Sequence, residues 1–132
     1  MVQENVPPRT KNWLIGHYRL VARALAWIGS LAIIVLSVVP AVDRPVTGVG
    51  QGLEHFAAFA LVGAVFAIGY RFSPLRLLVL AVFFCGGIEL LQVPLPTRHA
   101  RLSDFLIDSV GACFAILCVL SLNRLSALRS RE

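Results

Sequence analysis

The sequence is poor in charged residues, which make up 14% of its 132 residues, whereas 58% are hydrophobic. A soluble domain of this size carries about a quarter charged residues. The shortage excludes an ordinary soluble domain, and the mean hydropathy of +0.80 indicates an integral membrane protein. No linker, low-complexity tract or internal repeat divides the chain, so residues 1–132 are predicted to form a single domain.

Several functional signatures are also lacking. The three cysteines show neither metal-type spacing nor an even number for disulfides, and they are interpreted as small buried thiols. The glycines at positions 48, 50 and 52 lack the lysine and helix of a phosphate-binding loop, so no cofactor is predicted. Basic residues form no stripe with interleaved aromatics, which argues against nucleic acid despite a net charge of +5. The first apolar stretch is too long for a cleaved signal peptide and is predicted to stay as an anchor.

Four apolar stretches reach the length of about 20 residues that a transmembrane helix needs. They cover approximately residues 24–42, 53–70, 74–93 and 103–122, and they predict an all-α membrane protein built as a bundle of four transmembrane helices. Ser73 and Ser103 are predicted N-caps, with Pro74 at the first helical position of the third span. The connection at residues 71–74 is so short that spans two and three are expected to form a tight antiparallel pair.

Basic residues at the span ends predict the orientation, because cytoplasmic flanks collect lysine and arginine. Nine fall on the side of the two termini: Arg9, Lys11, Arg19, Arg23, Arg71, Arg76, Arg124, Arg129 and Arg131. Three fall on the other side: Arg44, Arg98 and Arg101. Both termini are therefore expected in the cytoplasm, with the chain crossing the cytoplasmic membrane of a cell several times.

Polar residues gather at the opposite, outward ends of the spans. The predicted functional cluster consists of His55, Glu89, Gln92, Arg98, Arg101, Asp104 and Asp108. Glu89 and Gln92 share one helix face, and Asp104 and Asp108 share another. Below Asp108, the small residues at positions 111, 112 and 115 suit close helix packing.

Each of these residues has a plainer interpretation. A charge at the bilayer centre costs about 2.5–3.5 kcal/mol. A functional role is therefore the favoured interpretation of Glu89, unless Arg98 or Arg101 pairs with it. Asp104 lies in a first helical turn, where its only role could be a favourable interaction with the helix dipole. Asp108 lies one turn deeper and is expected to pair with Arg101 or belong to a polar site.

The remaining members of the cluster are interpreted in the same way. His55 can act as an acid, a base or a ligand, or can simply lie at the interface. Gln92 is expected to orient Glu89 or an arginine. His99 is a weak candidate that is interpreted as interfacial. No residue is assigned a catalytic or metal-binding role.

These residues resemble the VanZ-like family of small multi-spanning bacterial membrane proteins. The family's Ser-x-x-Pro corresponds to Ser37-Val-Val-Pro40, and its His-Phe pair to His55-Phe56. Its Glu-x-x-Gln, proline-containing turn, arginine and Ser/Asp/Gly motif correspond to Glu89-Leu-Leu-Gln92, Pro94 and Pro96, Arg101 (or Arg98), Ser103-Asp104 and Asp108-x-x-Gly111. The resemblance covers most of the chain, from about residue 37 to residue 111.

Two departures from the family pattern are evident. The Asp-Lys pair that precedes the histidine is replaced by Gln51 and Gly52, and the usual asparagine is Asp108. The resemblance implies a cell-envelope protein associated with resistance to glycopeptide-type antibiotics, without implying a molecular activity.

Three functional hypotheses remain open. The cluster could bind a membrane lipid, an envelope lipid or a lipid-linked ligand, with Arg98 and Arg101 contacting phosphate or carboxylate. Alternatively, His55 and Glu89 could perform acid–base chemistry on a lipid-linked or phosphorylated envelope substrate, with a variant in which His55, Glu89, Asp104 and Asp108 hold Mg²⁺ or Mn²⁺. A transport path would require association into a homo-oligomer, because four spans without a repeat are few for a transporter.

Overall fold

The computed structural model describes residues 8–40, 48, 50–95 and 101–130. Within these ranges the chain folds into four α-helices: α1 (Pro8–Val38), α2 (Gln51–Gly69), α3 (Pro74–Gln92) and α4 (Leu102–Arg129). All four are long and apolar enough to cross a membrane, with candidate spans at Gly16–Val38, Gln51–Gly69, Pro74–Gln92 and Leu102–Arg129. For the described residues, the predicted all-α architecture is therefore confirmed, with four helices that are long and apolar enough to span a membrane.

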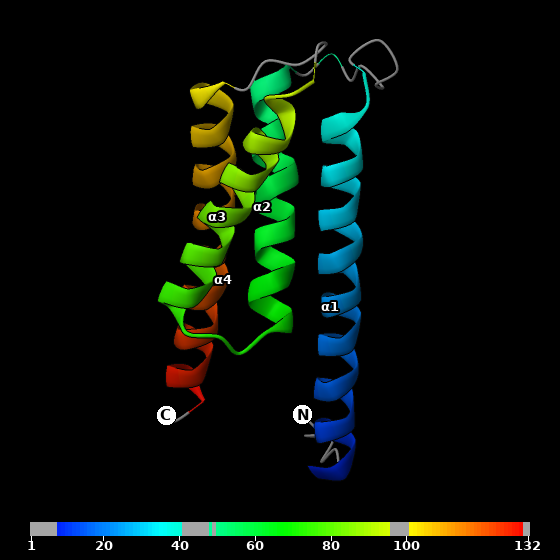
Figure 1. The fold of residues 1–132 in the computed structure, drawn as a ribbon. Coiled ribbons are helices and arrows are strands. Elements are labelled where there is room, and N and C mark those ends of the chain that lie inside the picture. The colour runs from blue at the N-terminus through cyan, green and yellow to red at the C-terminus, as the bar shows by residue number, and fades with distance from the viewer. Residues whose placement is uncertain (1–7, 41–47, 49, 96–100, 131–132) are drawn as a thin grey trace.

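The helices run alternately up and down, so the ends of the bundle differ (Figure 1). One end holds the last turns of α1 and α3 and the first turns of α2 and α4, and is called the loop end below. The other end holds both termini and the turn between α2 and α3, and is called the terminal end. The two termini thus lie at the same end of the bundle, as an even number of spans requires.

Helix boundaries follow local chemistry at several points. The predicted cap of α3 is confirmed, since the Arg76 N–H donates to Ser73 Oγ at 3.3 Å and Pro74 follows at the first helical position. α1 ends at Val38, shortly before Pro40, because a residue preceding proline is disfavoured in a helix. Gly50, the N-cap of α2, has a φ of 96°, which favours glycine.

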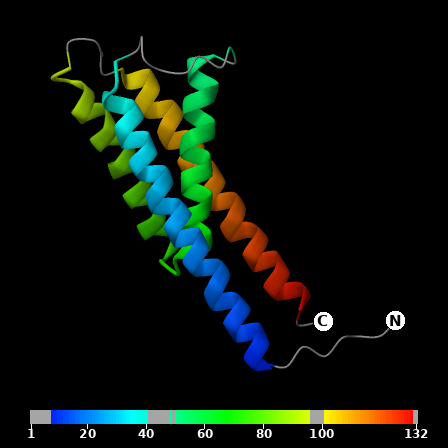
Figure 2. The same ribbon diagram turned by 90° about the vertical axis from the view of Figure 1, so that its right-hand side faces the viewer.

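Two helices are longer than the predicted spans. α1 begins at Pro8, whereas the first span was predicted from about residue 24, and α4 runs to Arg129, whereas the fourth span was predicted to reach about residue 122. At about 1.5 Å per residue, these helices of 31 and 28 residues exceed a hydrocarbon core of roughly 30 Å. Both extend past the α2–α3 turn at the terminal end (Figure 2). Hydropathy missed these extensions because they carry arginines that lie beyond the apolar segment.

The packing order also differs from expectation. α2 packs most extensively on α4 and next on α1, whereas α3 packs on α4 and touches α2 only sparingly. The prediction that spans two and three form a tight pair is therefore wrong. Their short connection joins helices that lie diagonally across the bundle, and α4 takes the place beside α2. The reason lies in glycines, which let α2 and α4 approach more closely than larger residues would allow.

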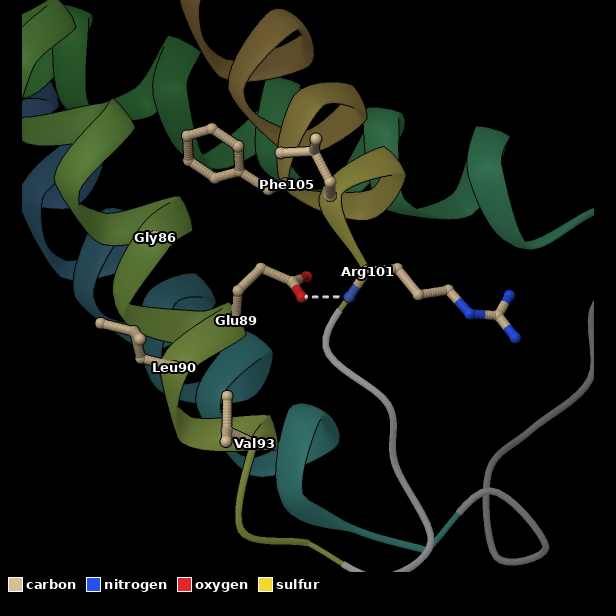
Figure 3. A pocket seen from close by; sticks show the side chains of 7 residues that line it. Gly86, Glu89, Leu90, Val93, Arg101 and Phe105 are labelled. Carbon is tan, nitrogen blue, oxygen red and sulfur yellow. Dashed lines mark hydrogen bonds between the residues drawn. The ribbon is translucent and has the colours of Figure 1, made fainter.

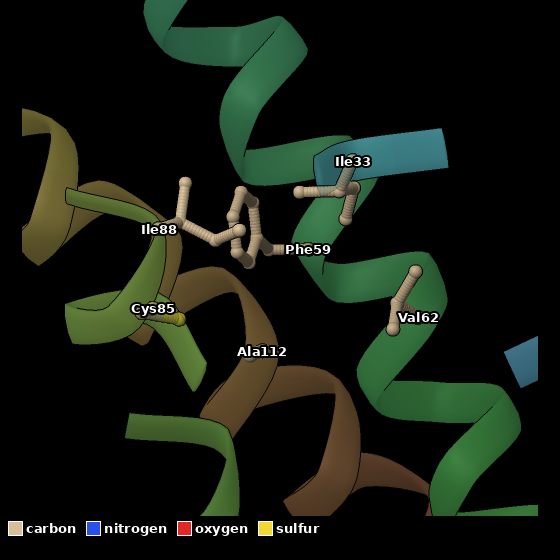
Figure 4. Close-up of a cluster of buried hydrophobic side chains, with 6 residues drawn as sticks. All are labelled: Ile33, Phe59, Val62, Cys85, Ile88 and Ala112. Carbon is tan, nitrogen blue, oxygen red and sulfur yellow. The ribbon is translucent and has the colours of Figure 1, made fainter. Parts of the chain in front are cut away.

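Two glycines set the contact between α2 and α4. A Cβ atom at Gly111 would lie 2.6 Å from the backbone oxygen of Phe56, and one at Gly63 would lie 2.7 Å from that of Ala112. Such small residues allow backbones to approach in a bilayer, where helix association depends on close packing. We call this contact the α2–α4 seam. Around it, all four helices contribute to a core of Ile33, Phe59, Val62, Cys85, Ile88 and Ala112 (Figure 4).

Candidate functional site

The described members of the predicted polar cluster all belong to the loop end. His55 lies in the second turn of α2, Glu89 and Gln92 lie in the last turn of α3, and Arg101 is the N-cap of α4. Asp104 and Asp108 follow in the first two turns of α4. Arg98 and His99 lie outside the described residues. The fold therefore brings together residues from three helices, as the sequence predicted.

His55 and Asp108 form a pair across the outer part of the α2–α4 seam. His55 Nδ1 lies 3.1 Å from Asp108 Oδ1, and because a carboxylate only accepts, the imidazole N–H donates. The Asp108 side chain is fully buried, whereas that of His55 is 17% exposed. The second oxygen, Asp108 Oδ2, is buried with no hydrogen-bond partner in the described part of the chain. Asp108 was expected to pair with Arg101 or to join a polar site, and its partner is the imidazole.

Among the described residues, Glu89 is held by the protein backbone rather than by a basic side chain. Its Oε2 accepts a hydrogen bond of 2.9 Å from the backbone N–H of Arg101. The Arg101 side chain points away from the carboxylate (Figure 3) and is exposed. An ion pair between Glu89 and the Arg101 guanidinium, which would have given Glu89 a purely structural role, is therefore absent. Glu89 is 8% exposed, and its Oε1 is buried without a hydrogen-bond partner among the described residues.

A pocket of about 370 Å³ lies beside this carboxylate, between the end of α3 and the start of α4. Its lining consists of Gly86, Glu89, Leu90, Val93, Arg101, Leu102 and Phe105 (Figure 3). We call it the α3–α4 pocket. Its outer walls are strongly exposed, at 73% for Leu90, 65% for Val93 and 74% for Leu102. The pocket is therefore open at the apolar outer surface of the helix bundle.

The surroundings of the pocket are acidic. Glu89 lies within electrostatic range of Asp104, Asp108 and the His55 imidazole. Asp104 is half-buried and accepts a hydrogen bond of 3.1 Å from the Ser103 hydroxyl. The predicted N-cap at Ser103 is wrong, because α4 starts at Leu102, with Arg101 as N-cap and no side-chain capping bond. The pocket thus joins an apolar wall to a negatively charged floor.

Gln92 is buried with 4% exposure, on the same side of α3 as Glu89. No group of three or more His, Cys, Asp or Glu side chains with the arrangement of a metal site occurs among the described residues. The proposed ligand set of His55, Glu89, Asp104 and Asp108 therefore finds no support in the geometry. Cys85, Cys113 and Cys118 are free, but only Cys85 is buried, so their interpretation as buried thiols is right for one of the three.

The walls of the pocket were not predicted from the sequence. Leu90, Val93, Leu102 and Phe105 are ordinary lipid-facing or packing residues in a hydropathy profile. The only available signal was Gly86, a small residue one turn before Glu89 on the same stripe of α3.

Comparison with known proteins gives no further guidance. No protein-family model, no curated protein and no solved structure matches this chain.

Proposed function

We propose that this chain is a multi-pass protein of the bacterial cytoplasmic membrane, related to the VanZ-like proteins, whose loop end faces outward and binds the head group of a membrane or envelope lipid. The observation that carries the proposal is the α3–α4 pocket. There a carboxylate oxygen without a hydrogen-bond partner among the described residues lies beside exposed apolar walls. Carboxylates in spanning segments are expensive, and those that persist face a partner or a cavity.

The distribution of charge supports the outward orientation of the loop end. The terminal end carries Arg19, Arg23, Arg71, Arg76, Arg124 and Arg129 among the described residues, whereas Arg101 is the described arginine of the loop end. Cytoplasmic flanks collect basic residues. Labelling of single cysteines in intact cells by a membrane-impermeant maleimide tests this orientation, after the three native cysteines are replaced by serine. A cysteine at position 103 is expected to react and one at position 130 is not. The reverse result would contradict the orientation.

Photo-cross-linking tests lipid binding independently of head-group chemistry. A phospholipid with a diazirine near the glycerol end of its acyl chain is incorporated into membranes that contain the protein. Leu90 and Leu75 offer a matched comparison, because both lie near an end of α3 and are 73% and 71% exposed. We expect adducts at Leu90 to exceed those at Leu75 several-fold. Equal labelling would mean that the pocket holds no lipid preferentially.

A variant that fills the pocket sharpens this experiment. A Cβ atom at Gly86 would meet Phe105 Cε2 at 3.7 Å, an ordinary contact, so Gly86→Leu places its side chain in the pocket without a backbone clash. Gly87 is the matched control, since it does not line the pocket and nothing lies within 4 Å of its Cβ position. Gly86→Leu is expected to abolish the excess labelling at Leu90, whereas Gly87→Leu leaves it unchanged.

The family resemblance adds a cellular prediction. Cells that make the wild-type chain are expected to tolerate a glycopeptide antibiotic better than cells that make Gly86→Leu at equal protein levels. Identical susceptibility of both strains to several glycopeptides would show that the pocket has no role in tolerance.

The pair of His55 and Asp108 favours a second candidate, an enzyme acting on a lipid-linked or phosphorylated envelope substrate. A buried carboxylate that accepts from Nδ1 fixes the imidazole tautomer and leaves Nε2 as the basic nitrogen. Such an enzyme would lose kcat in Asp108→Asn, with little change in KM, because the tautomer changes. The absence of any turnover of lipid-linked phosphates by purified protein in bilayers would exclude this candidate.

A further inference from the structure

We propose that the ligand of the α3–α4 pocket is a phospholipid whose head group carries a primary ammonium beside its phosphate, as an ethanolamine lipid does. This inference rests on the proposed lipid binding and specifies the chemistry that the pocket selects.

The floor of the pocket favours a cation. Glu89 is the acid in the pocket lining. Among the described residues its Oε1 lacks a hydrogen-bond partner, and its other oxygen accepts from a neutral backbone N–H. Asp104 and Asp108 lie within electrostatic range and add negative charge. The last turn of α3 also presents the negative end of its helix dipole here. An anionic group would be repelled from this floor, whereas an ammonium group would be attracted to it.

Hydrogen bonding selects a primary ammonium over a quaternary one. A carboxylate oxygen without a donor is satisfied by an N–H group, which a trimethylammonium group does not offer. Recognition of quaternary ammonium typically relies on a cage of aromatic rings. Phe105 is the aromatic residue in the lining, so the pocket provides an acceptor rather than a cage.

The opposite wall of the pocket favours a phosphate. The guanidinium of Arg101 is directed away from Glu89 and is exposed, which leaves it available to an oxyanion (Figure 3). α4 begins at Leu102 with no side-chain cap, so its first amides and positive dipole end add to the same side. The pocket therefore combines an acidic floor, to which both helices contribute, with the exposed guanidinium of Arg101 at its rim. This arrangement is complementary to a zwitterionic head group.

The depth of the pocket agrees with that of a lipid head group. Glu89 precedes the end of α3 by three residues, or about 4.5 Å along the helix axis. An ammonium at the head-group level could therefore reach the carboxylate while the acyl chains lie against Leu90, Val93 and Leu102. These three side chains are among the most exposed apolar residues of the chain.

A head-group series tests the inference. The purified full chain is reconstituted with phosphatidylethanolamine, its N,N-dimethyl derivative, phosphatidylcholine or phosphatidylglycerol, all with the same acyl chains. Native mass spectrometry then measures the lipid retained per protein after detergent dilution. One charge-assisted hydrogen bond contributes about 1.5–3 kcal/mol, so retention of phosphatidylethanolamine should exceed that of phosphatidylcholine by about tenfold or more.

Two variants assign that preference to Glu89. Glu89→Gln keeps an acceptor for the Arg101 N–H but removes the charge, and it is expected to abolish the preference for the primary ammonium. Glu54→Gln removes a carboxylate at the same end of the bundle, outside the pocket lining, and should preserve the preference. If Glu89→Gln does not fold, the head-group series with the wild-type chain still decides the question.

Each outcome discriminates between the two proposals. Equal retention of ethanolamine and choline lipids, or a preference for phosphatidylglycerol, would overturn the inference about the head group. If the excess photo-labelling at Leu90 persists in that case, the lipid-binding proposal stands. Loss of both the preference and the labelling would overturn both.

Discussion

α4 contacts its two main neighbours in different ways. Against α2 it packs through Gly111 and Gly63 so closely that no Cβ fits, and the acid in this seam, Asp108, is fully buried and bonded to His55. Against α3 it leaves the α3–α4 pocket, and the acid there, Glu89, is bonded to a backbone N–H and to no side chain of the described residues.

This contrast separates two uses of a buried carboxylate. The seam gives Asp108 a protein partner and excludes lipid, so the acid contributes to helix pairing. Within the described part of the chain, the pocket gives Glu89 no charged partner and leaves space beside it, so we propose that this acid is available to a ligand. The two acids lie at the same end of the bundle, and the roles proposed for them differ because the packing around them differs.

The largest effect on stability is expected from a substitution that disrupts the α2–α4 seam. In Gly111→Val, the Cβ atom alone would lie 2.6 Å from the backbone oxygen of Phe56. Backbone atoms cannot move aside as the end of a flexible side chain can. Overpacking of this kind costs about 1–3 kcal/mol or more. Thermal unfolding in detergent should show a strongly lowered midpoint.

Gly87→Ala is the control for this substitution. Its Cβ has open space, and alanine favours a helix over glycine by up to about 1 kcal/mol. Its midpoint should therefore stay the same or rise. If Gly111→Val and Gly87→Ala have the same midpoint of thermal unfolding, the close approach of α2 and α4 is not required for stability.

A smaller effect is expected from the polar pair in the seam. The variants His55→Ala, Asp108→Ala and their combination form a double-mutant cycle. Polar contacts between membrane helices average about 0.6 kcal/mol and reach about 1.7 kcal/mol, so a coupling energy in that range is expected. Urea unfolding in mixed micelles measures it. Additive effects of the two single variants would show that the contact contributes no stability.

The smallest effect on stability is expected at the pocket. Glu89→Gln retains an oxygen for the Arg101 N–H, so the free energy of unfolding should change by less than about 0.6 kcal/mol in the same assay. A larger loss than that caused by Asp108→Ala would reverse the comparison, since Glu89 would then be the structural acid.

The sequence predicted the four spans because lipid requires long apolar helices. It predicted the cap at Ser73 because serine is favoured as an N-cap and proline is favoured at the first helical position. It also placed His55, Glu89, Arg101 and Asp108 at one end, since antiparallel spans alternate in direction. Each of these predictions depends on neighbouring residues or on the order of spans along the chain.

The same local reasoning could not predict which helices pack against one another. The short connection between α2 and α3 requires only that two helix ends be close, and it does not require their sides to pack. The seam depends on which faces of α2 and α4 meet, and the sequence does not specify the rotation of a uniformly apolar helix. For the same reason, the sequence left open whether Asp108 pairs with Arg101 or belongs to a polar site, and it did not single out His55 as the partner.

Solid-state NMR in bilayers tests the central claim most directly, namely that the Glu89 carboxylate receives a lipid ammonium group. Protein labelled with ¹³C is reconstituted with phosphatidylethanolamine labelled with ¹⁵N, and dipolar coupling reports the distance from the Glu89 carboxyl carbon to the head-group nitrogen. A contact of about 4 Å, typical of an ion pair, is expected for the wild-type chain, and it should disappear in Glu89→Gln. A spectrum in which the nitrogen couples to no Glu89 carbon, in fully reconstituted and folded protein, would contradict it.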